Sequence, residues 1–273
     1  MKGPVSAALA LLLCSGPSLF ATWSVIAVDQ SSGQVAVAAA SCVDDVDDGM
    51  RDAIAVVVPG KGVAACQAAV DRTHQNHALV FAELEKGADP HRIIELLSAD
   101  PQFQSRQFGI LDLQGRVASH TGLNNSFEAL AVPGHVPGTG IYFEVQGNTI
   151  RSGAIAKGAK AFLDAAGSLT DRVMAAMESI DRNGGDIRCS CPPPEAHPSL
   201  PCDNKHAHAA FILLANPTDS SGEAESDGKY AMYLSVTQPA PGRRQGAREG
   251  ESLNPVKTLR MRYDAWKRSA AAR

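Results

Sequence analysis

A pair of short apolar segments separated by a tight turn is the strongest constraint on how this chain can fold. Residues 22–29 (TWSVIAVD) and 34–40 (QVAVAAA) are apolar and rich in β-branched or small side chains. This is the length and composition of buried strands. The QSSG sequence between them favours a turn, because serine and glycine adopt turn conformations readily. The sequence therefore predicts an antiparallel hairpin at this point.

The same pattern recurs along the chain and alternates with paired helical segments. Further strands are predicted at residues 53–58, 62–67, 107–112, 116–120, 143–150, 207–215 and 230–237. Apolar residues at helical spacing predict helices at residues 78–86, 91–98, 154–166, 169–183 and 255–268. Runs of strands joined by tight turns favour antiparallel sheets over βαβ units. We expect one α+β domain over residues 22–273, with a Cys- and Pro-rich insertion at residues 189–204.

Composition excludes several classes of protein. Hydrophobic residues make up 44% of the 273 residues, which is too many for a disordered chain. The formal net charge is -4, from 25 Lys+Arg against 29 Asp+Glu, so the basic excess typical of nucleic-acid-binding proteins is missing. We expect no nucleic-acid partner. We also expect no stable membrane span, because the apolar run at residues 5–14 is too short to cross a bilayer.

The first 21 residues have the organisation of a secretory signal peptide. Lys2 supplies a positive start, residues 5–14 form a nearly continuous apolar run, and Gly16 and Pro17 interrupt it before Ala21. We expect cleavage after Ala21 and a secreted or periplasmic protein. A retained N-terminal anchor is the alternative interpretation.

Cleavage after Ala21 would make Thr22 the first residue of the mature chain. An N-terminal threonine carries a hydroxyl nucleophile and a free α-amine, whose reference pKa of about 7.7–8.0 lets it act as a base near neutral pH. Because Thr22 opens a predicted buried strand, a rigid element would fix its position. Thr22 is therefore the candidate catalytic residue. The alternative is that Thr22 is simply the residue that follows the cut.

Six sequence segments carry a resemblance to a known family. They are TWSVIAVDQSSGQVAVAAAS (22–41), GVAACQA (62–68), RQFGILDLQGRVASHTG (106–122), VQGNTI (145–150), GGDIR (184–188) and NPVKTLR (254–260). In order and spacing they resemble domain of unknown function 1028. The resemblance implies the fold of the N-terminal-nucleophile (Ntn) hydrolases, a four-layer αββα sandwich of mostly antiparallel sheets, with Thr22 in the position of the nucleophile. It implies no particular reaction, since none is established for the family.

The resemblance also suggests which residues would line a substrate site around Thr22. Ser41 ends the second strand and would lie beside Thr22. Gln67, Thr121 and Asn148 lie at the ends of matched strands, where they can donate hydrogen bonds to a substrate carbonyl. Alternatively, all four side chains satisfy backbone groups at the strand ends.

The chain departs from the family pattern at two cysteines. The family commonly has a lysine after the serine of the second strand, where this chain has Cys42, and a threonine before the glutamine, where it has Cys66. In related hydrolases a lysine near the nucleophile lowers the pKa of the amine. Arg51 and Lys61 are the candidate replacements for that lysine.

Export also bears on the cysteines, because an oxidising compartment favours disulfide bonds. Removal of residues 1–21 leaves five of the six cysteines, so at least one is free or bonded to another chain. We expect Cys202 to pair with Cys189 or Cys191, and Cys42 to pair with Cys66.

Metal binding is the alternative for the histidines and cysteines that cluster late in the chain. His206 and His208 would share one face of a strand close to Cys202, but the Cys-x-Cys spacing upstream is atypical of zinc sites. The acidic stretch at residues 44–49 is not an EF-hand, because Val46 and Ala55 occupy ligand positions. A solvated loop is expected there, with a looser calcium site as the alternative. We predict no metal and no cofactor.

These observations favour an exported Ntn-type amidohydrolase that cleaves an amide bond of a small molecule or peptide with Thr22. The first alternative is a non-catalytic binding module that retains the Ntn fold, which the departures at Cys42 and Cys66 favour. The second is a disulfide-braced structural protein that assembles through the odd cysteine, with a homo-oligomer as one possible outcome.

Overall fold

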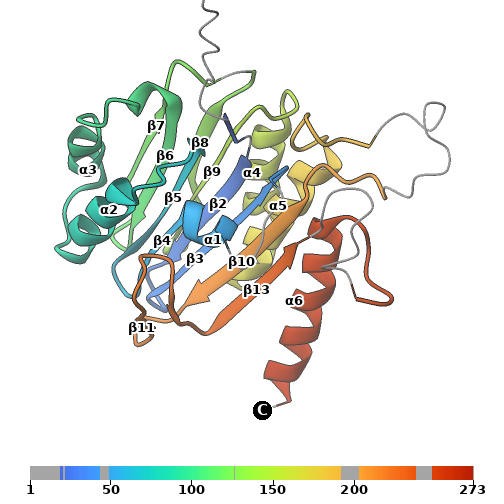
Figure 1. The fold of residues 1–273 in the computed structure, drawn as a ribbon. Coiled ribbons are helices and arrows are strands. Elements are labelled where there is room, and N and C mark those ends of the chain that lie inside the picture. The colour runs from blue at the N-terminus through green and yellow to red at the C-terminus, as the bar shows by residue number, and fades with distance from the viewer. Residues whose placement is uncertain are drawn as a thin grey trace, which may run out of the picture.

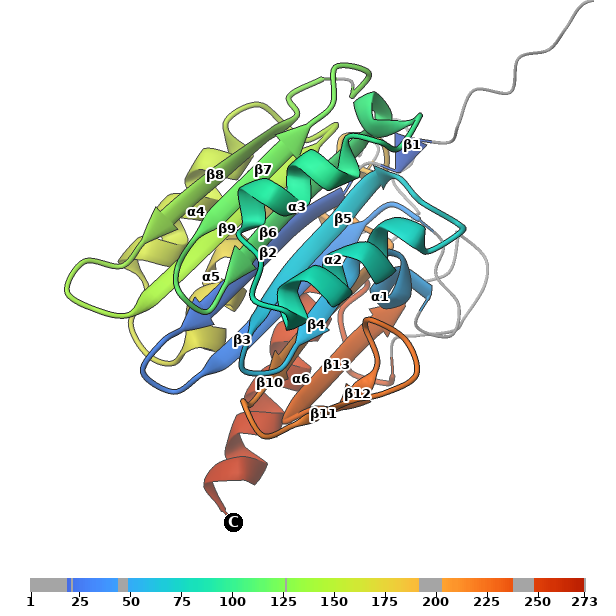
Figure 2. The ribbon, with the colours of Figure 1, turned by 90° about the vertical axis from the view of Figure 1, so that its left-hand side faces the viewer.

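Two β-sheets stacked face to face form the centre of the molecule, and helices cover the outer face of each (Figures 1 and 2). The computed structural model describes residues 19–20, 22–43, 49–125, 127–191, 203–237 and 248–272. The predicted four-layer α+β sandwich is therefore confirmed. None of the described helices is both long enough and apolar enough to span a bilayer.

Sheet A is the five-stranded sheet, in the order β1-β5-β6-β7 with β4 also beside β5. Its strands are β1 (Leu19–Phe20), β4 (Ala55–Val58), β5 (Gly62–Ala69), β6 (Arg106–Asp112) and β7 (Val117–Thr121). Every strand pairing in sheet A is antiparallel. Short turns join β4 to β5 and β6 to β7, as the sequence predicts.

Sheet B is the six-stranded sheet, in the order β13-β10-β3-β2-β9-β8. Its strands are β2 (Thr22–Asp29), β3 (Gln34–Ser41), β8 (Leu130–His135), β9 (Ile141–Asn148), β10 (Ala209–Ala215) and β13 (Met232–Thr237). The predicted hairpin of β2 and β3 lies at its centre and is antiparallel. A two-stranded ribbon, β11 (Ser220–Ser221) and β12 (Gly228–Lys229), lies between β10 and β13 in the sequence.

Helices make up the two outer layers, apart from the short helix at 49–54, whose buried Met50 and Ile54 pack between the sheets (Figure 2). The helices are α1 (Gly49–Ile54), α2 (Gln75–Glu85), α3 (Pro90–Leu97), the 3-10 turn Phe103–Ser105, α4 (Ala154–Asp164), α5 (Leu169–Arg182) and α6 (Pro255–Ala271). Ser168 and Asp171 form a capping box at the start of α5, and the Asn254 side chain accepts backbone N–H groups at the start of α6.

Three apolar layers hold the four structural layers together. Leu84, Ile93 and Phe108 belong to the layer between sheet A and helices α2 and α3. Trp23 and Phe162 belong to the layer between sheet B and helices α4 to α6. The third layer fills part of the space between the sheets, where its members include Ile26, Val28, Val57 and Phe211.

The alternation of side chains along β2 divides the inter-sheet space into an apolar part and a polar part. Trp23, Val25 and Ala27 pack towards the helices, so the even-numbered residues point at sheet A. Ile26 and Val28 join the apolar layer there, whereas Thr22 and Ser24 are buried polar residues. The polar part therefore lies at the N-terminal end of β2.

Helix α1 and strand β8 are among the elements of the structure that were not expected from the sequence. Helix α1 follows the acidic stretch, whose residues 44–48 lie outside the described part of the chain, so the predicted solvated loop there stays a prediction. Strand β8 contains Pro133 and Gly134, both of which disfavour strands. It lies at the edge of sheet B, where a proline without an N–H is tolerated.

Candidate functional site

Thr22 lies at the start of β2 with its side chain in the polar part of the inter-sheet space. It is 1% exposed, and its Oγ1 donates a hydrogen bond to Ser41 Oγ at 3.2 Å. Ser41 is directly opposite Thr22 in the β2–β3 register, which explains the contact. Among the described residues, no carboxylate or imidazole is hydrogen-bonded to the Thr22 hydroxyl.

The Gln67 side chain reaches Thr22 from the opposite sheet. Gln67 is near the end of β5, and its Nε2 donates to the Thr22 carbonyl oxygen at 3.1 Å and to Gln107 Oε1 at 2.8 Å. Just before Thr22, β1 pairs with the end of β5 in sheet A, whereas β2 belongs to sheet B. The chain therefore crosses from one sheet to the other between Phe20 and Thr22, beside Gln67.

Gln107 is the centre of a hydrogen-bond network that joins the two sheets. It is 0% exposed, and its Oε1 also accepts from Asn148 Nδ2 at 3.2 Å. Its Nε2 donates to Thr121 Oγ1 and to the Gly147 carbonyl oxygen, both at 3.0 Å. Asn148 lies opposite Thr22 in the β2–β9 register, on the other side from Ser41. The network therefore fixes the strand ends that surround Thr22.

A second set of buried polar groups continues along β9, away from Thr22. Gln146 Nε2 donates to Ser24 Oγ at 3.3 Å and to the Ala65 carbonyl oxygen at 3.0 Å. Two residues further on, Glu144 accepts a hydrogen bond from the Ser119 hydroxyl, and burial raises the pKa of Glu144 to about 8. Glu144 is therefore largely neutral at pH 7. It lies against Gly109, where a Cβ atom would overlap its carboxyl group.

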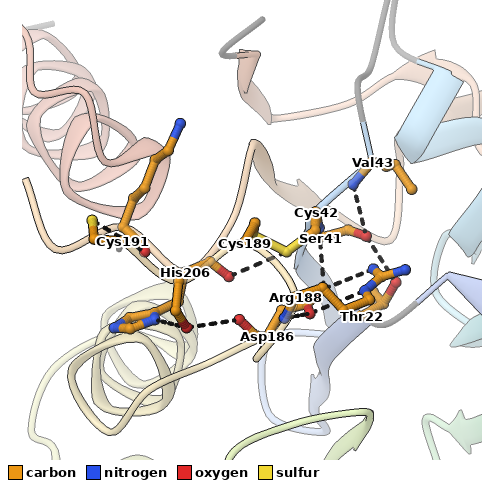
Figure 3. The surroundings of a disulfide bond; sticks show 11 residues. Thr22, Ser41, Cys42, Val43, Asp186, Arg188, Cys189, Cys191 and His206 are labelled. Atoms are coloured by element: carbon orange, nitrogen blue, oxygen red, sulfur yellow. Dashed lines mark hydrogen bonds and ion pairs between the residues drawn. A yellow bond between two sulfur atoms is a disulfide. The ribbon is translucent and has the colours of Figure 1, made fainter. Parts of the chain in front are cut away.

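A disulfide bond between Cys42 and Cys189 borders the site next to Ser41 (Figure 3). It anchors the segment after α5 to the end of β3. Asp186 Oδ2 accepts the Cys42 backbone N–H at 3.3 Å and a hydrogen bond from Arg188 Nη2 at 2.7 Å. Arg188 also donates from Nε to Asp186 Oδ1 at 3.1 Å. A buried carboxylate, a guanidinium group and a disulfide thus form one wall beside Ser41.

The predicted pairing of Cys42 with Cys66 is wrong. Cys66 is a buried free thiol, and burial raises its pKa well above the usual range. Its neighbours Val63 and Ala65 point at sheet B, so the even-numbered Cys66 points at α2 instead, away from Cys42. Period-two alternation therefore separates the two sulfur atoms.

The remaining cysteine predictions are corrected in part. Because Cys189 is bonded to Cys42, it is not the partner of Cys202; Cys191 is also disulfide-bonded. Cys202 lies outside the described residues. A disulfide bond is thus confirmed and the Cys189–Cys202 pairing is wrong, whereas the alternative pairing of Cys191 with Cys202 stays a prediction. His206 Nδ1 is 2.7 Å from Ser190 Oγ.

Neither candidate replacement for the family lysine lies near Thr22. Arg51 in α1 bonds to Asp52 and stacks over the ring of Tyr233. Lys61 lies in the β4–β5 turn, six residues before Gln67 on an extended strand, or roughly 20 Å away. The cation connected to the site through hydrogen bonds is Arg188, by way of Asp186 and the backbone of Cys42.

The space next to Gln67 on the α2 side is a cavity of about 10 Å³, which holds about one water molecule. Cys66, His77 and Arg106 are among its lining residues. Burial lowers the pKa of His77 to about 4, so its imidazole is neutral at pH 7. The cavity is too small for a substrate, so the chemistry is better sought at Thr22.

A model of the family described as "Family of unknown function (DUF1028)" matches residues 22–191. The chain belongs to the DUF1028 family. A crystal structure of a DUF1028 protein from Silicibacter pomeroyi is similar to the whole fold, with a TM-score of 0.62 at 18% sequence identity. The similarity covers 90% of this chain and 88% of that one. No curated protein sequence matches the chain.

In this DUF1028 protein, the structure brings the five predicted site residues to one end of the sandwich. The Ser41 side chain contacts the Thr22 hydroxyl, and the Gln67 side chain donates to the Thr22 carbonyl oxygen. Asn148 and Thr121 are joined to Gln67 through Gln107. The position of Gln107 itself was missed. Its signal in the sequence is an amide side chain directly before the apolar residues 108–111 of the strand RQFGILD.

Arg188 and Asp186 were also missed as neighbours of the site. Both belong to the GGDIR segment, which carries part of the family resemblance. Asp186 contacts Cys42, which is 144 residues away in the sequence, and no local pattern specifies such a contact.

Proposed function

We propose that this DUF1028 protein is an exported amidohydrolase of the Ntn type, in which Thr22 is the nucleophile. The observation that carries the proposal is the position of Thr22. It is the first residue of a central strand, its hydroxyl bonds to Ser41, and its carbonyl oxygen is held by Gln67. The four-layer arrangement around this strand agrees with the Ntn-hydrolase fold that the sequence resemblance implies.

The proposed mechanism begins with removal of residues 1–21 during export. The α-amine of Thr22 then takes the proton from its own hydroxyl as Oγ1 attacks the carbonyl carbon of an amide. Backbone N–H groups near the strand ends, together with Asn148 or Gln67, stabilise the negative charge on the carbonyl oxygen. The amine returns the proton to the leaving nitrogen, and water releases the acyl group from Oγ1.

Within this proposal, Ser41 and Arg188 have supporting roles. Ser41 Oγ accepts the Thr22 hydroxyl and fixes its direction. Arg188 pairs with Asp186 and so positions the carboxylate that accepts the Cys42 backbone N–H, on the side of the site where Cys42 replaces the lysine common in the family.

The first test is N-terminal sequencing of the exported protein, followed by labelling with an electrophile that acylates N-terminal nucleophiles, such as a β-lactone. We expect the mature chain to begin at Thr22 and the label to be on that residue. Thr22→Ala should abolish labelling, whereas Thr22→Ser should retain it. Thr139→Ala is a matched control, because Thr139 lies just before β9, at the end of that strand far from Asn148 and Thr22. A different mature N-terminus, or unchanged labelling of Thr22→Ala, contradicts the proposal.

A non-catalytic binding module is the second candidate. The observation that favours it is the disulfide at Cys42, which takes the position of the family lysine and places no amine there. The hydrolase and the binding module differ in the expected behaviour of Thr22→Ala. A binding module binds its ligand equally well in wild-type and Thr22→Ala protein, and neither protein carries a covalent label.

A further inference from the structure

The last residues of β5 form a strand edge, and the residues that precede Thr22 pair with this edge. On one flank β5 pairs with β4 over Gly62–Ala65 only, and further along the same strand Leu19 and Phe20 pair antiparallel with Ala69 and Ala68. The other flank of β5 pairs with β6 through Ala68. Among the described residues, β1 is therefore the strand that covers the edge at Ala68 and Ala69.

This edge is held in place by interactions that do not involve β1. The buried side chain of Arg106 donates to the Ala69 carbonyl oxygen and, through Nε, to Asp100 Oδ2 at 2.9 Å. Ala68 has φ +74°, a left-handed conformation that is strained in a non-glycine residue. A strained backbone that buried side chains hold in place is a feature of preformed binding sites.

The edge leads directly to Thr22. Gln67 precedes Ala68, and its Nε2 donates to the carbonyl oxygen of Thr22 at 3.1 Å. A strand that pairs with Ala69 and then Ala68 therefore runs towards Thr22, as residues 19–20 do. A chain that continues such a strand beyond Ala68 is thus directed at Thr22, whose side chain points at sheet A.

We propose that, once residues 1–21 are removed, the Ala68–Ala69 edge binds an extended peptide as an added antiparallel strand, so that the substrate is a peptide amide. This inference rests on the proposed cleavage before Thr22. Main-chain hydrogen bonds to β5 give the affinity, as in other proteins that bind peptides by adding a strand. The acyl side of the substrate takes the place of residues 19–20, and its scissile carbonyl lies at Thr22.

The test uses the full chain with an engineered protease site that ends at residue 21, so that processing does not depend on export. The protein carries Thr22→Ala, so that binding is measured without turnover. The probe is a fluorescent hexapeptide with the sequence of residues 16–21, GPSLFA, and a free carboxylate. Fluorescence anisotropy before and after cleavage measures its binding. The control probe carries N-methyl groups on its leucine and phenylalanine, because one of these two adjacent N–H groups faces β5 in an antiparallel pairing.

We expect the cleaved protein to bind the peptide and the uncleaved protein to bind at least tenfold more weakly, because its own residues cover the edge. The N-methylated peptide should bind roughly tenfold more weakly, as expected for the loss of its main-chain hydrogen bond to β5. Equal binding before and after cleavage, equal binding of the N-methylated peptide, or no binding at all overturns the inference.

The outcome is separable from that of the proposed function. Covalent labelling of Thr22 in the wild type without peptide binding by the cleaved Thr22→Ala protein retains the nucleophile and overturns the peptide site. Peptide binding with the expected controls, but without labelling of Thr22, supports the peptide site and contradicts the hydrolase.

Discussion

At the scale of single residues, Gln107 makes the clearest prediction. Its side chain joins β5, β7 and β9 from a fully buried position. Gln107→Leu would leave Gln67, Asn148 and the Gly147 carbonyl oxygen each without one hydrogen-bond partner. We expect a loss of roughly 2–4 kcal/mol in the free energy of unfolding, measured in urea.

The control for Gln107 is Gln114→Leu, in the exposed β6–β7 turn, which should change the free energy of unfolding by less than about 0.5 kcal/mol. If the two variants are equally stable, Gln107 does not hold the strand ends together. In that event the arrangement around Thr22 has another origin.

Glu144 makes a prediction about pH. Burial raises its pKa from 4.5 to about 8, so the folded protein retains a proton that the unfolded chain loses in this interval. Stability from this group is therefore complete below pH 4.5 and is lost as the pH rises towards 8. Relative to Glu144→Gln, the wild type should lose roughly 2–4 kcal/mol of unfolding free energy between pH 5 and pH 8. The exposed Glu85→Gln should show no such difference; parallel pH profiles for wild type and Glu144→Gln would contradict the prediction.

At the scale of secondary-structure elements, the Cys42–Cys189 bond attaches the segment after α5 to the end of β3. The bonded residues are 147 positions apart, so the crosslink restricts the unfolded chain strongly. We expect Cys42→Ala with Cys189→Ala to lower the free energy of unfolding by roughly 2–5 kcal/mol. Cys66→Ala removes a buried sulfur atom but no crosslink and is the matched control. A double variant no less stable than this control would show that the bond adds nothing.

The sequence predicts best those helices and strands that carry a regular pattern of apolar residues along their whole length. The hairpin of β2 and β3 has uninterrupted apolar strands around a four-residue turn, and its bounds agree with the structure within one residue. Strand β8 was missed because Pro133 and Gly134 argue against a strand, and only its edge position makes them acceptable. Helix α1 was missed because its six residues are too few to show helical periodicity.

At the scale of the whole molecule, burial should set the order in which regions open. Strand β2 has a paired strand on each side and packed layers on both faces, and seven of its eight residues are buried. Strand β8 has one neighbour and no fully buried residue. We expect the amides of β2 to exchange with solvent at least a hundredfold more slowly than those of β8, measured by native-state hydrogen exchange. Similar rates in the two strands would show that the sandwich does not open from this edge.

The candidate site could be predicted from the sequence only in part, and the reason is geometric. Thr22, Ser41 and Asn148 lie at the ends of neighbouring strands, so their proximity follows once the strands are paired. The contact between Thr22 and Gln67 depends on how sheet A is stacked on sheet B, which no local pattern specifies. The cysteine pairing failed for a related reason, because Cys66 points to the outer face of sheet A.

The disulfide also divides the chain into a covalent ring and two open arms. The ring runs from Cys42 to Cys189 and includes α1 to α5, β8, β9 and all of sheet A except β1. The arms supply β2 and β3 on one side and β10, β13 and α6 on the other, so they contribute four of the six strands of sheet B. A single backbone break inside the ring, for example in the exposed loop at Leu123, would release no fragment. The nicked protein would remain one covalent molecule, with Thr22 still attached through β2 and β3 to Cys42.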